Sequence, residues 1–445
     1  MKNILVIGAG RSSTILIGFL LKEAEAFGWL ITVADAEPST AAERIDGHKH
    51  GLSVWLDVQK PNDRKDLIKR SDLVISLLPA HLHIKVAKDC VTLRKHLLTA
   101  SYLSPDLESM RDVVKGNGLT FITEMGVDPG IDHMSAMRFI DEIRGIGGDI
   151  YDFRSYTGGL VAPESDDNPW HYKITWNPSN VVRAGQGTAQ YLEQKQPRFV
   201  PSGRVFLDPR AVHVKGLGTL EMYPNRNSLQ YQEAYGLDQI SHMLRGTLRY
   251  PGFCEAWHAL AKIGLTDTYS IIHNAGGLTY RKLLEGFLPA GNGPLKNRLA
   301  EFLEISVDSD LLYKIEWLGL LSSTSIDLHS ASAAEILLQL LLKKWEMKEG
   351  DTDLVVMQHE IRYRQNDRDH CKTSSMIYRG KDFKNTAMSQ LVGWPLGITA
   401  KLIMTGKLDY PGIHRPISAL LYEPVLKGLE DMGVQFFDRD GDEAL

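Results

Sequence analysis

Two acids lie close together in the segment GVDPGIDHM, residues 126–134. Asp128 precedes a Pro-Gly turn, and Asp132 follows that turn with His133 directly after it. Carboxylates beside a histidine can bind an ammonium group or move protons during catalysis. The pattern is equally typical of an ordinary strand-to-helix loop, in which Asp132 caps a helix that begins near His133. These nine residues alone leave both interpretations open.

A second group of ligand-binding candidates lies near the N-terminus. The run KNILVIGAGRSST, residues 2–14, is an apolar, β-branched segment that ends in glycines and leads into a helical pattern. In dinucleotide-binding loops such glycines let the backbone approach a pyrophosphate at a helix N-terminus. The third glycine of that pattern is missing, so the alternative is a related sheet that no longer binds a nucleotide. The expected contacts are Gly8, Gly10, Arg11, Ser12 and Ser13.

The ends of two further expected strands carry candidate nucleotide contacts. Asp35 closes the second strand, where an acid binds the ribose hydroxyls and repels a 2′-phosphate. The cofactor predicted from Asp35 is therefore NAD, with NADP possible. Leu77 and Leu78 follow the strand at residues 72–75 and could line the nucleotide crevice, although plain loop packing explains them equally well.

The composition excludes several functional classes. The chain has 445 residues, of which 43% are hydrophobic and 24% charged, and a net charge of −5, so binding of nucleic acid through bulk positive charge is not expected. Three isolated cysteines argue against a disulfide framework or a zinc site. No apolar run is long enough to span a membrane, and the N-terminus lacks the pattern of a signal peptide. We therefore expect a cytoplasmic protein without a membrane partner.

The elements that must position these residues alternate between strand and helix over the first 128 residues. Near-continuous apolar strands, separated by segments such as 83–95 and 105–117 with helical periodicity, predict a doubly wound parallel sheet of the Rossmann type. An apolar helix at 385–408 would complete this α/β domain, with a kink or break at Pro395.

The pattern changes after residue 128. We expect a mixed α/β substrate-binding domain at 129–235 and 346–384, an all-helical insert at 236–345, and a C-terminal tail at 409–445. Within these ranges, VVRAG (181–185) is typical of a strand, and LDQISHMLRGTLRY (237–250) is typical of a helix. The turn residues at 365–370, between two strand-like runs, predict a hairpin.

Five motifs, together with the glycine loop, carry a family resemblance. They are TASYLSP (99–105), GVDPGIDHM (126–134), GGLVAPESDDNPWHYKITW (158–176), YPNRNS (223–228) and RGTLRYPGF (245–253). The residues of these motifs and their order along the chain resemble those of the glutamate-forming saccharopine dehydrogenases, also called saccharopine reductases. The resemblance covers nearly the whole chain. The resemblance implies a Rossmann domain, a mixed α/β domain for substrate binding and dimerisation, a helical insert and a homodimer.

The resemblance also implies a reaction. Saccharopine is lysine joined to glutamate through a secondary amine, and NAD(P)-dependent oxidation gives an imine whose hydrolysis yields glutamate and 2-aminoadipate 6-semialdehyde, or the reverse. Proton transfers at nitrogen and water require an acid or base. Three substrate carboxylates call for arginine forks. The reaction needs no metal, and we expect none.

Site residues follow from the resemblance position by position. Tyr102 and Asp128 would be catalytic, and Ser101, Val127 and Lys173 would lie near the cofactor. The implied substrate-binding residues are Ser101, Tyr102, Asp128, Arg226, Thr247, Leu248 and Arg249. The alternatives are a salt bridge for each arginine and simple packing for Tyr102.

Two departures from fungal relatives concern the chemistry. Those relatives have a cysteine where this chain has Thr157, and they use NADP and lack the acid at the end of the second strand. Two other functions stay open: a related imine or amine dehydrogenase, acting on carboxynorspermidine or on lysine itself, and a non-catalytic NAD-binding scaffold or sensor. A substrate with fewer carboxylates would not need both Arg226 and Arg249, and a sensor would need neither Tyr102 nor Asp128.

Overall fold

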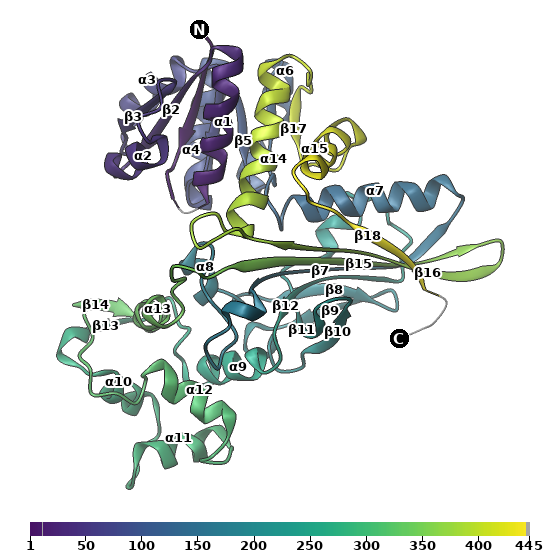
Figure 1. The fold of residues 1–445 in the computed structure, drawn as a ribbon. Coiled ribbons are helices and arrows are strands. Elements are labelled where there is room, and N and C mark those ends of the chain that lie inside the picture. The colour runs from purple at the N-terminus through teal and green to yellow at the C-terminus, as the bar shows by residue number, and fades with distance from the viewer. Residues whose placement is uncertain (11, 442–445) are drawn as a thin grey trace. The chain divides into compact units, whose positions relative to one another are not determined.

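The computed structural model describes residues 1–10 and 12–441, which form two compact units (Figure 1). The first unit comprises Met1–Ile150, Tyr363–His370 and Met376–Asp440. The second comprises Tyr151–Arg362 and Cys371–Ser375, together with Gly441. Arg11, one of the expected nucleotide contacts, lies outside the described residues.

The first unit is built on a parallel sheet of seven strands, which confirms the Rossmann-type prediction. The strand order is β17-β6-β5-β4-β1-β2-β3, and every neighbouring pair is parallel. The chain reverses its direction of winding at β1, between β2 and β4, which is where such sheets bind ligands at the carboxyl ends of their strands. The strands are β1 (Asn3–Ile7), β2 (Leu30–Asp35), β3 (Gly51–Trp55), β4 (Leu73–Ser76), β5 (His96–Thr99), β6 (Thr120–Ile122) and β17 (Gly412–His414).

Helices pack on this sheet through apolar faces. Leu5 and Val74 of the sheet share one buried cluster with Val86 and Cys90 of α4. The helices of this unit are α1 (Ser13–Phe27), α2 (Pro38–Ile45), α3 (Pro61–Lys69), η1 (Ala80–Leu82), α4 (His83–Leu93), α5 (Pro105–Glu108), α6 (Arg111–Gly116), α7 (Ile131–Gly145), α14 (Ala387–Met404) and α15 (Ala419–Asp431).

The late helix α14 packs directly beside α1 (Figure 1). Two glycines on one face of α14 allow the close approach: a Cβ on Gly393 would lie 2.7 Å from the backbone nitrogen of Leu16, and a Cβ on Gly397 would lie 2.5 Å from the ring of Phe19. Of the two predicted alternatives at Pro395, a kink or a break, the break is wrong, since α14 is continuous through that residue. Packing against α1 holds this turn in helical geometry although proline cannot donate a hydrogen bond there.

The second sheet has nine strands and is mixed. Its main path is β10-β11-β12-β7-β15-β16-β18, and β8 pairs with β12 and β9. β12 is parallel to β7 and antiparallel to β11. The strands are β7 (Asp149–Val161), β8 (Ala189–Glu193), β9 (Gln196–Val200), β10 (Arg210–Val214), β11 (Gly218–Pro224), β12 (His242–Arg249), β15 (Asp353–Gln365), β16 (Arg368–Arg379) and β18 (Phe437–Gly441).

The hairpin predicted near residue 366 is confirmed. β15 and β16 are joined by Asn366 and Asp367, which have φ angles of 51° and 59°. Positive φ at both central residues is the geometry of a tight two-residue hairpin turn, and asparagine and aspartate tolerate it better than most residues.

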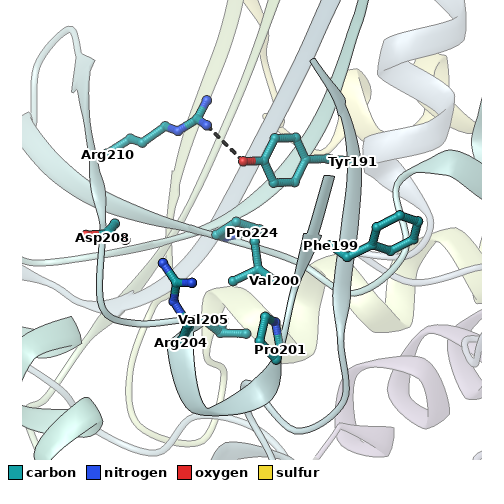
Figure 2. A pocket seen from close by; sticks show the side chains of 9 residues that line it. All are labelled: Tyr191, Phe199, Val200, Pro201, Arg204, Val205, Asp208, Arg210 and Pro224. Carbon is teal, nitrogen blue, oxygen red and sulfur yellow. Dashed lines mark hydrogen bonds between the residues drawn. The ribbon is translucent and has the colours of Figure 1, made fainter. Parts of the chain in front are cut away.

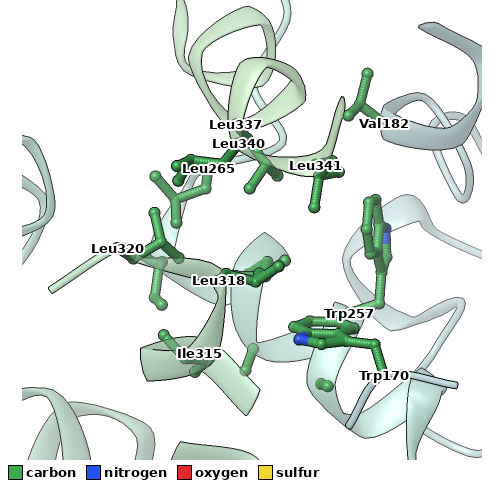
Figure 3. Packing of buried hydrophobic residues seen from close by; sticks show 14 of the residues in the cluster. Trp170, Val182, Trp257, Leu265, Ile315, Leu318, Leu320, Leu337, Leu340 and Leu341 are labelled. Atoms are coloured by element: carbon green, nitrogen blue, oxygen red, sulfur yellow. The ribbon is translucent and has the colours of Figure 1, made fainter. Parts of the chain in front are cut away.

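The helical part of the second unit has its own apolar core. Trp170, Trp257 and Leu341 belong to one buried cluster there (Figure 3). A short two-stranded sheet, β13 (Ile271–His273) with β14 (Ser330–Ser332), accompanies the helices. The helices of this unit are η2 (Pro163–Ser165), α8 (Pro178–Val182), η3 (Ser202–Arg204), η4 (Leu229–Tyr231), α9 (Phe253–Ile263), η5 (Ala275–Gly277), α10 (Tyr280–Phe287), α11 (Leu295–Leu303), α12 (Asp310–Leu318) and α13 (Ala333–Lys344).

Two local predictions are wrong. The segment 237–250 is not a helix, because residues 242–249 form β12 between β7 and β11. Long-range pairing overrides the apolar spacing, and Gly246 suits the strand since a Cβ there would collide with Met222. The segment 181–185 is not a strand: α8 covers its first two residues, and Asn177 caps that helix by accepting the Ser179 N–H at 3.0 Å.

No helix within residues 1–10 and 12–441 has both the length and the apolar composition that crossing a membrane requires.

Candidate active site

The glycine loop after β1 has space for a phosphate group. Gly8 has a φ of 107°, and a Cβ there would lie 3.1 Å from the carbonyl oxygen of Leu77, so the fold itself requires glycine at this position. Gly10 is exposed, and a Cβ there would meet nothing within 4 Å. Packing within the described residues does not require glycine at this position, and the open space leaves room for a ligand to approach the Gly10 backbone.

The N-terminus of α1 supports the same interpretation. The Ser13 N–H and hydroxyl both donate to the carbonyl oxygen of Gly10, at 3.0 and 2.7 Å, which ties the loop to the helix. Ser12 is the N-cap residue, and its side chain accepts no hydrogen bond from the first turn. The N–H groups of that turn can therefore serve an anion, as at the helix N-termini that bind pyrophosphate. These residues fit a dinucleotide.

Asp35 lies beside this loop, at the end of β2. Its Oδ2 accepts the backbone N–H of Ala9 at 2.6 Å, and its Oδ1 accepts the N–H of Glu37 at 2.9 Å. The carboxylate is thus held at the loop that would carry the pyrophosphate, where an acid can accept hydrogen bonds from ribose. Leu77 contacts Gly8 through its backbone, whereas the Leu78 side chain packs on the buried cluster of this unit.

The two residues expected to be catalytic form a hydrogen bond with each other. The hydroxyl of Tyr102 donates to Oδ1 of Asp128, with an oxygen–oxygen distance of 3.0 Å. Tyr102 follows β5, and Asp128 lies in the loop between β6 and α7. Since β5 and β6 are neighbouring parallel strands, the topology brings their carboxyl ends together at one edge of the sheet.

The loop around Asp128 has a compact backbone. The Gly126 N–H donates to the carbonyl oxygen of Pro129 at 2.9 Å, and Gly130 has a φ of 149°. A Cβ on Gly130 would lie 2.1 Å from the carbonyl oxygen of Gly126, so only glycine fits there. Val127, predicted to be near the cofactor, has a buried side chain.

The prediction that Asp132 is the N-cap of the following helix is wrong. Helix α7 begins at Ile131 with Gly130 as its N-cap, so Asp132 lies within the first turn. Its Oδ1 accepts the N–H of Gly130 at 2.6 Å, which still satisfies a backbone donor at the helix start. His133 is fully buried, and its Nε2 lies 2.9 Å from Oε2 of Glu124.

In the second unit, Arg249 is a buried cation. Its side chain lies among the rings of Tyr172, Tyr223 and Phe253, with its guanidinium carbon 5.2 to 5.8 Å from the ring centroids. Its Nη1 donates to the carbonyl oxygen of Leu248 at 2.7 Å, and its Nε has no hydrogen-bond partner among the described residues.

No described acidic side chain forms an ion pair with Arg249. Its cross-strand neighbour is Glu221, but the Glu221 carboxylate accepts the N–H groups of Gly252 and Cys254 at the start of α9, at 2.6 and 3.0 Å. A buried guanidinium without a carboxylate partner is costly, and a ligand carboxylate would compensate it.

The other predicted substrate contacts of this unit lie along the same two strands. Arg226 is exposed and follows β11, where Asn225 donates its N–H to the Arg245 carbonyl oxygen. Arg226 is thus about four strand residues, or ~13 Å, from Arg249 along β12. Two arginines at that separation suit two carboxylates of one extended ligand better than a clamp on a single carboxylate.

Thr247 and Leu248 differ in what they can offer a ligand. Thr247 is half-buried on β12 and pairs with Thr157 of β7. The Leu248 side chain is fully buried, and a Cβ on Gly158 would lie 2.8 Å from its carbonyl oxygen. Only the backbone of Leu248 is therefore suited to a polar contact.

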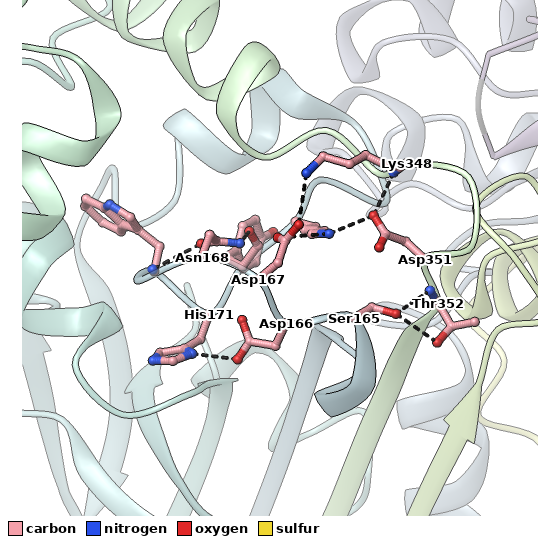
Figure 4. A network of polar contacts seen from close by, with 11 residues as sticks. Ser165, Asp166, Asp167, Asn168, His171, Lys348, Asp351 and Thr352 are labelled. Atoms are coloured by element: carbon pink, nitrogen blue, oxygen red, sulfur yellow. Dashed lines mark hydrogen bonds and ion pairs between the residues drawn. The ribbon is translucent and has the colours of Figure 1, made fainter.

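Lys173 takes part in a network of ion pairs. Figure 4 shows three other members of this network, Asp167, Lys348 and Asp351. Its side chain is 1% exposed, and its Nζ lies 2.7 Å from Asp351 and 3.0 Å from Asp167. Lys348 also contacts Asp167, at 2.9 Å. Burial raises the pKa of Asp167, but the hydrogen bonds from the two lysines outweigh burial and leave that pKa below its usual value. These ion pairs give Lys173 a structural role, while its contact with the cofactor stays a prediction.

A cavity of about 260 Å³ lies elsewhere in the second unit (Figure 2). Arg210 donates to the hydroxyl of Tyr191 across it, at 3.1 Å, and also pairs with Glu193. None of the predicted site residues lines this cavity.

Comparison with known protein families assigns the chain to one of them. Residues 4–122 match the family described as the saccharopine dehydrogenase NADP binding domain, and residues 126–434 match the saccharopine dehydrogenase C-terminal domain. The chain belongs to the saccharopine dehydrogenase family. The resemblance seen in the sequence is confirmed, and the first unit carries the family's nucleotide-binding domain.

Individual relatives agree with this assignment. The mitochondrial alpha-aminoadipic semialdehyde synthase of Bos taurus is 34% identical over 98% of this chain, but the match covers 47% of that protein. The chain therefore spans about half the length of the curated synthases that it matches. The NADP(+)-dependent, L-glutamate-forming saccharopine dehydrogenase of Saccharomyces cerevisiae is 29% identical, over 97% of both chains.

A solved structure shows the same fold. The apo saccharopine dehydrogenase (L-Glu forming) of Saccharomyces cerevisiae superposes with a TM-score of 0.88 and 28% identity, covering 99% of this chain and all of that one. The homospermidine synthase of Legionella pneumophila has a TM-score of 0.58 at 10% identity, which shows a shared fold alone.

The sequence motifs of this saccharopine dehydrogenase family member did not reveal His83. Its Nδ1 lies 2.8 Å from the Ser76 hydroxyl, and its Nε2 lies 2.8 Å from the hydroxyl of Ser101, a predicted ligand contact. Burial, helped by the charge of His81, lowers the pKa of His83 to about 4. The ring is therefore neutral at pH 7, so one of its nitrogens donates and the other accepts. The only hint in the sequence was a histidine at the start of the helix that follows β4, where His83 is the first residue of α4.

The buried His83 predicts a defined acid sensitivity. Because its pKa is about 4 in the folded chain and about 6.5 when unfolded, the unfolded state binds more protons between these values. His83 should stabilise the fold fully above pH 6.5, and up to about 3 kcal/mol of that contribution should be lost as the pH falls to 4. Denaturant unfolding of the wild type and of His83→Gln at pH 7, 5.5 and 4.5 would measure it. Parallel pH dependence in both proteins would contradict the assignment.

Proposed function

We propose that this protein oxidises saccharopine to glutamate and 2-aminoadipate 6-semialdehyde with a nicotinamide cofactor, or catalyses the reverse reaction. The names of the relatives support both the substrate and the products, since they include an L-glutamate-forming saccharopine dehydrogenase and alpha-aminoadipic semialdehyde synthases. The homodimer and the cytoplasmic location expected from the sequence stay predictions.

The observation that carries the proposal is the unpaired Arg249. The residue is 4% exposed, and its guanidinium is surrounded by aromatic rings and has no acidic partner in the described part of the chain. A substrate carboxylate can bind it in a bidentate manner and offset the cost of its burial. Arg226, which is exposed and lies about four strand residues away along β12, would bind a second carboxylate. A tricarboxylate such as saccharopine suits two such arginines.

Tyr102 and Asp128 are the proposed proton-transfer pair. The Tyr102 hydroxyl donates to Oδ1 of Asp128 and orients the carboxylate, which would accept a proton from the substrate nitrogen or from the attacking water. The cofactor, when bound, accepts the hydride. Gly8, Gly10, Ser12 and Ser13 would hold its pyrophosphate, and Ser101, oriented by His83, would contact the ligand beside Tyr102.

The deciding experiment mixes purified protein with saccharopine and either NAD or NADP. It follows the formation of the reduced cofactor by its absorbance. Turnover with either cofactor supports the proposal. Nucleotide binding without turnover of saccharopine would oppose it, and assays with carboxynorspermidine and lysine would then test the related dehydrogenases. Nucleotide binding without turnover of any of these substrates would favour a sensor.

Asp35 predicts the preferred cofactor. We expect a higher kcat/KM with NAD than with NADP, because the carboxylate accepts ribose hydrogen bonds and repels a 2′-phosphate. Asp35→Asn retains an oxygen that can accept the Ala9 N–H but removes the charge, so the NAD-to-NADP ratio of kcat/KM should fall about 10- to 100-fold, as for loss of a hydrogen bond to a charged group. Asp46→Asn, in the same unit, is a matched control. A wild type that prefers NADP would overturn this assignment and leave the reaction unchanged.

A further inference from the structure

Glu124 is a buried acid just after β6, and no sequence motif singles it out. Its side chain is 1% exposed, and its φ is 58°, a region that residues other than glycine rarely adopt. Backbone strain of this kind persists only where surrounding contacts enforce it, and it gathers at functional sites. The contacts that enforce it here all lie within the first unit.

Three donors converge on the carboxylate of Glu124. Its Oε1 accepts the backbone N–H of Leu103 at 2.9 Å and the Nε of Arg415 at 3.0 Å. Its Oε2 lies 2.9 Å from Nε2 of His133. Burial opposes ionisation, but His133, Arg415 and the Leu103 N–H together lower the pKa of Glu124 to about 2. The group is therefore a carboxylate at neutral pH.

These contacts hold the chain on both sides of Tyr102. The backbone N–H of Glu124 donates to the carbonyl oxygen of Ser101 at 2.9 Å, while its side chain accepts the N–H of Leu103. One residue thus fixes the peptide groups immediately before and after Tyr102. Both bonds fix the backbone from which the Tyr102 ring reaches Asp128.

The same carboxylate also holds the segment that carries Asp128. His133 lies in the first turn of α7, two residues after the helix begins. That turn is bonded back to the Asp128 loop, since Asp132 donates its N–H to the carbonyl oxygen of Val127 at 3.0 Å. Fixing His133 therefore fixes the loop, and with it the 3.0 Å bond between Tyr102 and Asp128.

We propose that Glu124 is a positioning residue, which sets the geometry of the Tyr102–Asp128 pair by binding the flanks of Tyr102 and the helix that follows Asp128. This inference rests on the proposed function, in which that pair transfers protons. Arg415, from the segment after β17, completes the arrangement, so the C-terminal part of the chain contributes to the position of Tyr102.

The test compares Glu124→Gln with Glu108→Gln, whose exposed carboxylate pairs with Arg111 in the same unit. A glutamine keeps the size of the side chain but cannot accept from all three donors at once. We expect kcat for saccharopine to fall about 10- to 100-fold, the range for a misplacement of catalytic groups by up to an ångström, with KM for the nucleotide changed less than about twofold. Glu108→Gln should match the wild type.

A double-mutant cycle separates positioning from a general structural role. If Glu124 acts through Tyr102, then Glu124→Gln should lower kcat much less in a Tyr102→Phe background than in the wild type. An equal fractional loss in both backgrounds would overturn the role through Tyr102, and an unchanged kcat in Glu124→Gln would overturn the inference as a whole. If Glu124→Gln does not fold, Arg415→Met removes one donor and supports the same cycle.

A second readout does not depend on turnover. Amide hydrogen exchange, followed by mass spectrometry, should quicken in Glu124→Gln for peptides spanning residues 101–104 and 125–133, and stay unchanged in the strands β1 and β4. Exchange that is unchanged at 101–104 would overturn the positioning role even if the wild type does not oxidise saccharopine. An inactive wild type with locally faster exchange in the variant would instead count against the proposed function alone.

Discussion

Replacing Asp128 by asparagine is expected to lower kcat for saccharopine oxidation by about 10²- to 10⁴-fold, the usual contribution of a positioned acid or base. Asparagine keeps the shape of the side chain and an oxygen that can accept the Tyr102 hydroxyl. It cannot take up a proton, so the loss reports proton transfer rather than packing. Steady-state kinetics at saturating nucleotide would measure it.

Nucleotide binding should be nearly unaffected by Asp128→Asn, because the glycine loop and Asp35 lie on other strands of the sheet. Tyr102→Phe should lower kcat less than Asp128→Asn does, because the Tyr102 hydroxyl orients the carboxylate whereas the carboxylate itself takes up the proton. Asp106→Asn, an exposed acid near Tyr102 in the chain, serves as the control. A kcat within threefold of the wild type in Asp128→Asn would show that another group transfers the proton.

The nucleotide-binding domain was predictable because its signals are local. An apolar strand, two glycines, a helix and an acid at the end of the next strand lie within 35 residues, and each has one physical role. The structure adds why Gly8 and Gly10 differ. Gly8 is required by the neighbouring Leu77 backbone, whereas Gly10 borders open space, which suits a ligand.

Long-range contacts explain what the sequence could not show. Residues 242–249 have helix-like apolar spacing but form a strand, because β7 and β11, distant in the chain, pair with it on both sides. Glu124 stands in an otherwise apolar run before a turn, and only the fold reveals the three donors that gather on it. Asp132 was predicted to be the N-cap of α7, but the helix begins at Ile131, so Asp132 is its second residue and accepts the Gly130 N–H from within the first turn.

The role of Arg249 also could not be decided from the sequence alone, but it can be tested by experiment. Its residue type and motif pointed to a carboxylate, but a salt bridge within the chain was the open alternative. The structure removes that alternative for the described residues, because Glu221 across the strand is engaged at the start of α9. Removing an arginine whose partner is a ligand should leave the stability of the free protein nearly unchanged. Removing an arginine that pairs with an acid within the fold should lower that stability.

Arg249→Met is therefore expected to separate binding from stability. We expect kcat/KM for saccharopine to fall about 10²- to 10³-fold, equivalent to about 3–4 kcal/mol, because a buried charge pair with the substrate is lost. The free energy of unfolding without ligand should not decrease by more than about 1 kcal/mol, since methionine fills the aromatic surroundings and no buried acid is left unpaired. Kinetics and denaturant unfolding of the same preparation give both values.

The chain offers a matched contrast in Arg64. Its Nε lies 2.6 Å from Oδ2 of Asp89, and both side chains are buried. Arg64→Met leaves the buried Asp89 with only Lys65, whose Nζ lies 3.9 Å from Oδ1, and should cost up to about 3–5 kcal/mol of stability, with little change in the KM for saccharopine. If Arg249→Met instead lost stability like Arg64→Met and kept its kcat/KM, Arg249 would be a structural residue. Arg249→Met should lose activity and keep stability, whereas Arg64→Met should lose stability and keep its KM. This contrast makes Arg249 the most direct test of whether the second unit binds a carboxylate substrate.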